Sequence, residues 1–121
     1  TPDMFHAMAR MQEPSAQLAS VSRSFGKKVI LTEIGIQSVQ GALAAPWDYS
    51  RGSDSNAVID TTGQAFYYEV MLSTLGNQSW CAGMFWWNWE SIPSSNEATN
   101  YTVRNKPAAN ILRTWYGRQG L

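Results

Sequence analysis

Two short apolar segments, separated by a segment with helical spacing, constrain the fold of this chain most. Residues 27–33 and 81–87 are rich in strand-forming residues and show no alternation of polar and apolar side chains, which is typical of strands buried on both faces of a parallel sheet. Residues 62–75 place apolar side chains at helical intervals. Because this helix joins the two strands, we expect them to pair in parallel through a right-handed crossover. The sequence therefore predicts an α/β fold.

Helices are predicted on both sides of this unit. Residues 4–25 carry apolar side chains at steps of three and four. We expect Pro14 to kink or divide this helix, and Gly26 to end it in the left-handed conformation. A last helix is predicted to open at residues 105–107 and to stop at Gly117. The predicted order is helix, strand, helix, strand, helix.

The length of the chain is too small for a complete barrel of strand–helix units. The chain has 121 residues, whereas a (β/α)8 barrel takes about 250. A two-stranded parallel sheet leaves two edges and two faces to be covered. Residues 37–61 form a polar loop of a length that is usually functional. We therefore expect residues 1–121 to be one part of a larger domain.

The composition excludes several classes of protein. Nine basic and nine acidic residues give a net charge of zero, which argues against a nucleic-acid partner. No run of about 18 apolar residues predicts a membrane span. A single cysteine, Cys81, and a single histidine, His6, provide no disulfide framework and no Cys-rich zinc site. We expect no metal and no nucleotide or redox cofactor.

A carboxylate and a group of indoles lie at the predicted ends of the two strands. Glu33 ends the first strand, and Trp86, Trp87 and Trp89 end the second. Ligands of parallel α/β domains bind at the carboxyl ends of the strands. There a carboxylate can attack an anomeric carbon while an aromatic ring stacks on the C–H face of the sugar. The alternatives are a surface carboxylate and indoles that fill a core. The pattern favours a glycosidase-type site.

Several motifs resemble those of a known enzyme family. Residues 32–35, Thr-Glu-Ile-Gly, resemble the seventh strand of the retaining (β/α)8 glycoside hydrolases, in which a Thr-Glu-x-Gly pattern carries the nucleophile. Residues 38–42, Ser-Val-Gln-Gly-Ala, and residues 46–47, Pro-Trp, are similar to the continuation of that motif in glycoside hydrolase family 113, a group of β-mannanases. Residues 82–89 resemble the eighth strand of that family, and residues 101–117 resemble its closing helix.

The resemblance implies a fold and an activity. The chain would be the C-terminal portion of a (β/α)8 barrel, about strands 7 and 8 with their flanking helices. The activity implied is retaining cleavage of β-1,4-linked, mannan-type polysaccharide, with Glu33 as the nucleophile. Trp87 and Trp89 are the residues predicted to stack on sugar, with Trp86 as a reserve. Trp47 is predicted either at the rim of the cleft or as a loop anchor. The partners implied are a β-linked oligo- or polysaccharide and the remainder of the barrel.

The sequence departs from the family pattern at the general acid/base. In the family this residue is a second glutamate at the end of the fourth strand, and nothing in the chain corresponds to it. Glu13 and Glu69 are placed on helices, and Glu90 is interpreted as a loop residue that contacts sugar hydroxyls. Since a retaining site needs two carboxyl groups about 5–5.5 Å apart, we expect the 121 residues alone to be inactive.

Two other functions stay open at this point. One is a non-catalytic carbohydrate-binding or scaffold protein that has kept the barrel and lost an acid. The other is a self-contained α/β interaction domain, which the uncovered strand edges disfavour. The triplets at residues 77–79 and 100–102 have the form of N-glycosylation acceptors and favour secretion, with a cytoplasmic location as the alternative. Discrimination among β-glycans and the choice of endo or exo action are expected to lie on strands outside the chain.

Overall fold

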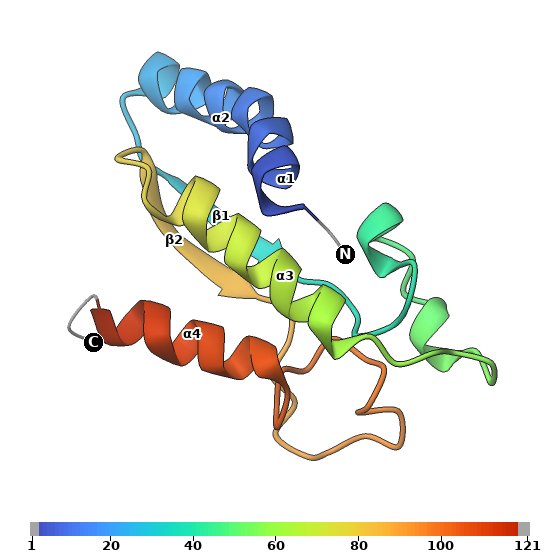
Figure 1. Ribbon diagram of the computed structural model, residues 1–121. Coiled ribbons are helices and arrows are strands. Elements are labelled where there is room, and N and C mark those ends of the chain that lie inside the picture. The colour runs from blue at the N-terminus through green and yellow to red at the C-terminus, as the bar shows by residue number, and fades with distance from the viewer. Residues whose placement is uncertain (1–2, 119–121) are drawn as a thin grey trace.

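The structure, a computed structural model, describes residues 3–118 and has the predicted order of elements (Figure 1). A last turn of π-helical width, Leu72–Gly76, continues the third helix, and the loop after the first strand contains two short 3-10 turns, Ala42–Ala44 and Arg51–Ser53. The helices and strands are α1 (Met4–Arg10), α2 (Gln12–Phe25), β1 (Val29–Ile34), α3 (Thr61–Met71), β2 (Cys81–Trp86) and α4 (Pro107–Arg118). Within residues 3–118, no helix is long and apolar enough to cross a membrane.

The two strands pair in parallel, as predicted, with α3 between them in the sequence. Their register is irregular near the end of β1, where Leu31 lies opposite Met84 and Ile34 lies opposite Trp86. β1 therefore advances three residues while β2 advances two, and one residue of β1 is left over. An extra residue of this kind bends a strand and redirects its side chains. The irregularity falls on the segment that contains Glu33.

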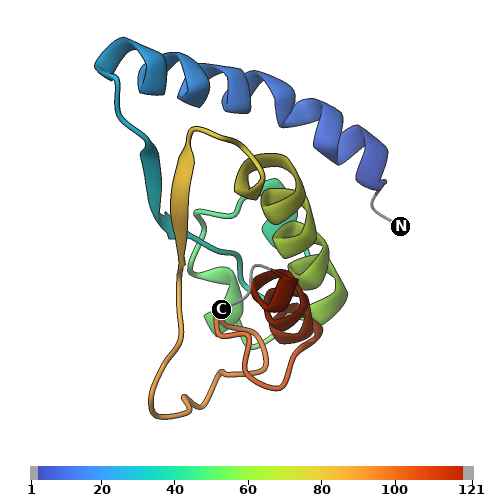
Figure 2. The ribbon, with the colours of Figure 1, turned by 90° about the vertical axis from the view of Figure 1, so that its left-hand side faces the viewer.

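One face of the sheet is uncovered, which corrects the expectation that both faces are buried. Helices α3 and α4 lie on one side of the two strands, and the other side is open (Figure 2). On the open side the side chains of Ile30 and Phe85 are 51% and 63% exposed. Strands without polar alternation need cover on both faces, and the described residues supply helices for one. The uncovered face, together with α1 and α2, is called the open region below.

The first predicted helix is divided into two pieces, as the presence of Pro14 predicts. The break lies at Met11, which ends α1 and precedes α2. Pro14 lies in the first turn of α2, where its missing N–H costs no bond within α2, but a continuous helix would need that N–H to bond to Arg10, the last residue of α1. Gly26 ends α2 in the left-handed conformation with φ 60°, as predicted. At the other end of the chain Gly117 does not stop α4, which continues to Arg118.

A hydrophobic core lies beyond the carboxyl ends of the strands. A cluster of buried side chains joins the loop after β1 to α3, to the loop after β2 and to α4. This cluster, called the loop core below, consists of Ile36, Val39, Ala42, Ala65, Tyr68, Val103 and Ala108. The buried side chain of Gln64 on α3 ties the two loops together, since its Nε2 donates to the backbone oxygens of Ile36 at 3.0 Å and Tyr101 at 3.1 Å. The predicted long loop is therefore partly core.

Candidate active site

The structure brings Glu33 and Trp87 together at adjacent strand ends. Glu33 is exposed near the end of β1, and Trp87 directly follows β2. The backbone N–H of Trp87 donates to the carbonyl oxygen of Ile34 at 2.7 Å. The residue next to the predicted nucleophile is thus hydrogen-bonded to the residue predicted to stack on sugar. A carboxylate and an indole that is 49% exposed lie at the same end of the sheet.

Gly35 allows the two strand ends to approach this closely. A Cβ atom at this position would lie 2.0 Å from the carbonyl oxygen of Trp87. The position of this Cβ is fixed by the backbone of residue 35, and the carbonyl oxygen belongs to the backbone of Trp87, so no change of rotamer could relieve the clash. The hydroxyl of Tyr67 on α3 is hydrogen-bonded to the backbone of Gly35. Burial raises the pKa of this hydroxyl, and the hydrogen bond opposes that effect. The glycine of the Thr-Glu-Ile-Gly motif is therefore a packing requirement of the site.

Trp86 points away from Trp87, toward the helices. Its ring stacks on Tyr68 of α3, with centroids 4.2 Å apart and an angle of 17° between the planes. Its Nε1 donates to the hydroxyl oxygen of Tyr116 on α4 at 3.1 Å. Burial raises the pKa of the Tyr68 hydroxyl. Because successive side chains of a strand point to opposite faces, Trp86 fills the layer between sheet and helices, and we do not retain it as a sugar-stacking residue.

Trp89 lies farther along the loop after β2 and carries a cation over its ring. The indole is 62% exposed, and the guanidinium carbon of Arg104 lies 5.2 Å from the ring centroid. Arg104 also pairs with Glu97, with 3.2 Å between Nη1 and Oε1, and its Nη2 donates to the backbone oxygen of Glu90. Sequence reasoning missed Arg104 and Glu97, because no local spacing relates either residue to Trp89.

Trp47 is largely exposed in the loop between β1 and α3. The backbone on either side of Trp47 is held in place by hydrogen bonds from other side chains. The Gln37 side chain donates to the backbone oxygen of Tyr49 at 2.9 Å, and the Tyr101 hydroxyl donates to that of Pro46 at 3.4 Å. The exposure of Trp47 argues against the loop-anchor alternative, since an anchoring ring would be packed.

A buried lysine joins the loops that follow the two strands. The Nζ of Lys106 donates to the Oγ of Ser38 at 2.8 Å and to the backbone oxygen of Asn100 at 3.2 Å. Burial lowers the pKa of Lys106 to about 8, and the carboxylates of Glu97 and Glu90 act in the opposite direction. The sequence pattern predicts this lysine only as part of a helix start. The structure shows that its side chain is buried between the loops that follow the two strands.

The two predicted glycosylation triplets have different environments. Asn77 is exposed, whereas Asn100 is buried. The side chain of Asn100 donates to the Oγ of Ser94 at 2.7 Å and accepts from the backbone N–H of Thr102 at 3.0 Å. A buried asparagine with both ends of its side chain hydrogen-bonded is not accessible for modification in the folded chain.

The other acidic residues considered for catalysis are not assembled around Glu33 by any described contact. Glu13 and Glu69 are exposed on α2 and α3, and Glu90 lies in the loop after β2. Among residues 3–118, His, Cys, Asp and Glu side chains form no group of three or more that could hold a metal ion.

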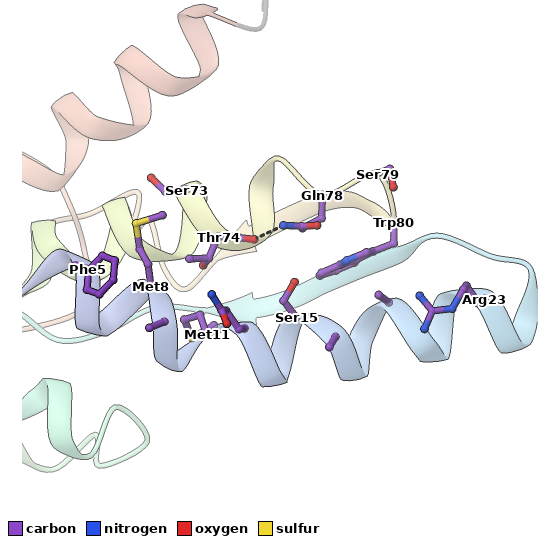
Figure 3. A pocket seen from close by; sticks show the side chains of 14 residues that line it. Phe5, Met8, Met11, Ser15, Arg23, Ser73, Thr74, Gln78, Ser79 and Trp80 are labelled. Atoms are coloured by element: carbon purple, nitrogen blue, oxygen red, sulfur yellow. Dashed lines mark hydrogen bonds between the residues drawn. The ribbon is translucent and has the colours of Figure 1, made fainter.

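A groove lies at the opposite end of the strands from Glu33. This groove, of about 780 Å³, separates α1 and α2 from the segment that ends at Trp80, immediately before β2 (Figure 3). Met8, Met11 and Ser15 line it from the helices, and Thr74 lines it from the other side. The groove belongs to the open region, so volume alone does not locate the candidate site.

A parallel strand–helix–strand unit with a carboxylate and exposed indoles at adjacent carboxyl ends is the arrangement used by (β/α)8 glycoside hydrolases. Residues 3–106 match the family model described as Glycoside Hydrolase Family 113. The chain belongs to Glycoside Hydrolase Family 113.

Solved structures of that family share the fold. The GH113 β-mannanase AaManA from Alicyclobacillus acidocaldarius, in complex with ManMIm, superposes with a TM-score of 0.74 at 25% identity, over 91% of this chain and 36% of that chain. A complex of a GH113 β-1,4-mannanase gives a TM-score of 0.73 at 23% identity, over 91% and 35%. No curated protein sequence gives a significant match. The chain thus spans about a third of these (β/α)8 barrels and folds as an α/β part of one.

Proposed function

We propose that this chain is the C-terminal part, about strands 7 and 8, of a retaining glycoside hydrolase that cleaves β-1,4-linked, mannan-type polysaccharide. The observation that carries the proposal is the position of Glu33 and Trp87 at adjacent strand ends, joined by the hydrogen bond from the Trp87 N–H to the carbonyl oxygen of Ile34, in a chain of family GH113. The similar structures are of β-mannanases, which supports the substrate class.

In the proposed reaction the Glu33 carboxylate is the nucleophile. It attacks the anomeric carbon and forms a glycosyl ester, while the leaving oxygen takes a proton from an acid supplied by the remainder of the barrel. A water molecule then attacks the same anomeric carbon and gives its proton to the conjugate base of that acid. The glycosyl ester is cleaved, and Glu33 is released as a carboxylate. Trp87 and Trp89 present ring faces on which sugar rings stack.

The uncovered face of the sheet supports the need for the remainder of the barrel. Ile30 and Phe85 are apolar side chains that point into solvent on this face. Apolar surface of this kind gains free energy when another layer covers it. The relatives of known structure are about three times as long as the part that this chain matches. We propose that the first six strands complete the barrel and carry the acid/base.

The decisive experiment is Glu33→Gln in the complete barrel protein. We expect mannan hydrolysis to fall by roughly 10³-fold or more, because the amide is a poor nucleophile, while binding of mannan oligosaccharides is kept. Glu69→Gln, on the exposed face of α3, is the matched control and should leave the rate unchanged. A wild-type rate in Glu33→Gln would exclude this residue as the nucleophile.

A non-catalytic carbohydrate-binding protein is the second candidate. The exposed rings of Trp87, Trp89 and Trp47 favour it, since they would bind sugar without a second carboxylate. The same experiment separates the two functions. Binding of mannan oligosaccharides by wild-type protein and Glu33→Gln alike, with hydrolysis by neither, would identify the binder.

A further inference from the structure

Arg104 makes three contacts that converge on the loop carrying Trp89. Its guanidinium carbon lies 5.2 Å from the centroid of the Trp89 ring, its Nη1 pairs with Glu97, and its Nη2 donates to the backbone oxygen of Glu90. The side chains of Arg104 and Glu97 are only 18% and 24% exposed. Partial burial strengthens both an ion pair and a cation–π contact, because solvent screens them less. Arg104 thus fixes both the ring and the neighbouring backbone.

The backbone that carries Arg104 is attached to the loop core and to the loop that follows β1. The backbone N–H of Arg104 donates to the Oγ1 of Thr102, which is fully buried, at 3.4 Å. Two residues after Arg104, Lys106 is bound to Ser38 in the loop that follows β1. Trp89, by contrast, lies in a segment of the loop that forms neither helix nor strand. The order of the Trp89 ring therefore depends on Arg104 more than on local backbone structure.

A guanidinium group suits this role better than an ammonium group. It is planar, so it can lie against an indole and pair with a carboxylate through separate N–H groups at the same time. Lysine offers one compact charge and cannot hold all three partners in a fixed orientation. A ring with a cation against one face keeps its opposite face free for a ligand.

We propose that Arg104, oriented by Glu97, is a positioning residue that fixes Trp89 as a sugar-stacking platform for the β-linked polysaccharide. The inference rests on the proposed function and deepens it. A fixed ring loses less conformational freedom when sugar binds, which favours affinity and not the bond-breaking step. Arg104 therefore affects binding of the saccharide through Trp89 and takes no part in the chemistry at Glu33.

The test measures kcat and KM for mannan oligosaccharides in the complete barrel protein. Arg104→Met is expected to raise KM by roughly 3- to 10-fold and to change kcat by less than about 2-fold. Arg104→Lys should restore only part of the affinity. Arg113→Met is the matched control, since Arg113 lies exposed on α4, where its Nη1 donates to the Oδ1 of Asn110 on the same helix. This control should leave KM and kcat at their wild-type values.

A double-mutant cycle distinguishes positioning from general destabilisation. If Arg104 acts through Trp89, the pair Arg104→Met and Trp89→Ala should raise KM no more than Trp89→Ala alone. Additive effects, or an unchanged KM in folded Arg104→Met, would overturn the proposal. Should Arg104→Met not fold, Glu97→Gln decides: a raised KM with unchanged kcat supports positioning, and an unchanged KM overturns it.

Binding measurements separate failure of this inference from failure of the proposed function. The dissociation constant of mannohexaose, followed by the fluorescence of the indoles, does not depend on turnover. If wild-type protein binds mannohexaose without hydrolysing it, the enzyme proposal fails while the same cycle on dissociation constants still tests Arg104. If Arg104→Met and wild type bind equally, the inference fails even when hydrolysis is normal.

Discussion

The loop core and the open region differ in how well their apolar side chains are covered. In the loop core, Ile36 and Tyr68 are fully buried, and polar groups such as Gln64 are hydrogen-bonded to backbone across loops. In the open region, none of the residues described in α1 and α2 is buried, and Phe25 and Phe85 lie largely in solvent. The chain thus completes one region by its own contacts and leaves the other to be covered.

This difference indicates which part of the candidate site the chain determines on its own. Gln64 and Lys106 hold the loops that follow the two strands to each other, and Arg104 makes contacts within the loop that follows β2. Among residues 3–118, no comparable contact covers the open face of the sheet. Glu33 lies where the two regions meet, so its backbone is fixed by contacts of this chain while its side chain is exposed.

Tyr68→Ala should give the largest loss of stability. Removing a fully buried ring that stacks on Trp86 leaves a cavity, and we expect a loss of about 3–5 kcal/mol in the free energy of unfolding. Phe25→Ala, in the open region, should change it by less than about 0.5 kcal/mol. Urea unfolding followed by tryptophan fluorescence measures both. Equal losses would remove the distinction between the two regions.

Gly35→Ala should be the next most damaging change. The added Cβ would meet the backbone oxygen of Trp87, and we expect a loss of about 3 kcal/mol together with reduced activity. At Gly83 on β2, no described atom lies within 4 Å of the same Cβ. Gly83→Ala should therefore be neutral in the 121-residue chain. If Gly83→Ala lowers the free energy of unfolding only in the complete barrel protein, the open face of the sheet is covered there.

The pH dependence of stability tests the buried lysine. Because the folded pKa of Lys106, about 8, is below the ordinary 10.5, the unfolded chain binds more protons between these values. Stability should therefore rise with pH over this interval, by roughly 3 kcal/mol at most. Lys106→Met should abolish this contribution, and Lys28→Met, at an exposed position before β1, should not. Wild type and Lys106→Met with parallel pH profiles would contradict the assignment.

The smallest effects are expected at two helix glycines. Gly26 has φ 60° at the end of α2, so Gly26→Ala should cost about 1 kcal/mol even though space is available. Gly117 lies inside α4, where alanine is the better helix former, and Gly117→Ala should raise stability by about 0.5–1 kcal/mol. Thermal unfolding measures the change in melting temperature of each variant. Changes of the same sign in Gly26→Ala and Gly117→Ala would refute the prediction.

Sequence reasoning predicted most of the backbone and less of the site. The parallel pair of strands, the end of α2 at Gly26 and the meeting of Glu33 with Trp87 follow from patterns within short segments. The division of the first helix also follows from the sequence, because Pro14 lacks the N–H that a continuous helix would need. The predicted stop at Gly117 was wrong, since α4 continues to Arg118. Glycine is compatible with helical backbone, so it does not fix a boundary by itself.

By itself, the sequence determined the class of fold and the strand ends that carry the carboxylate and the indoles. Periodicity and turn preferences act over a few residues, so they can be read along the chain. Only the tertiary structure decided that Trp86 packs inward, that Arg104 holds Trp89, and that Lys106 reaches Ser38 across 68 positions of the sequence. Such contacts depend on where separate segments meet in space, and no local pattern of residues specifies which segments lie next to each other.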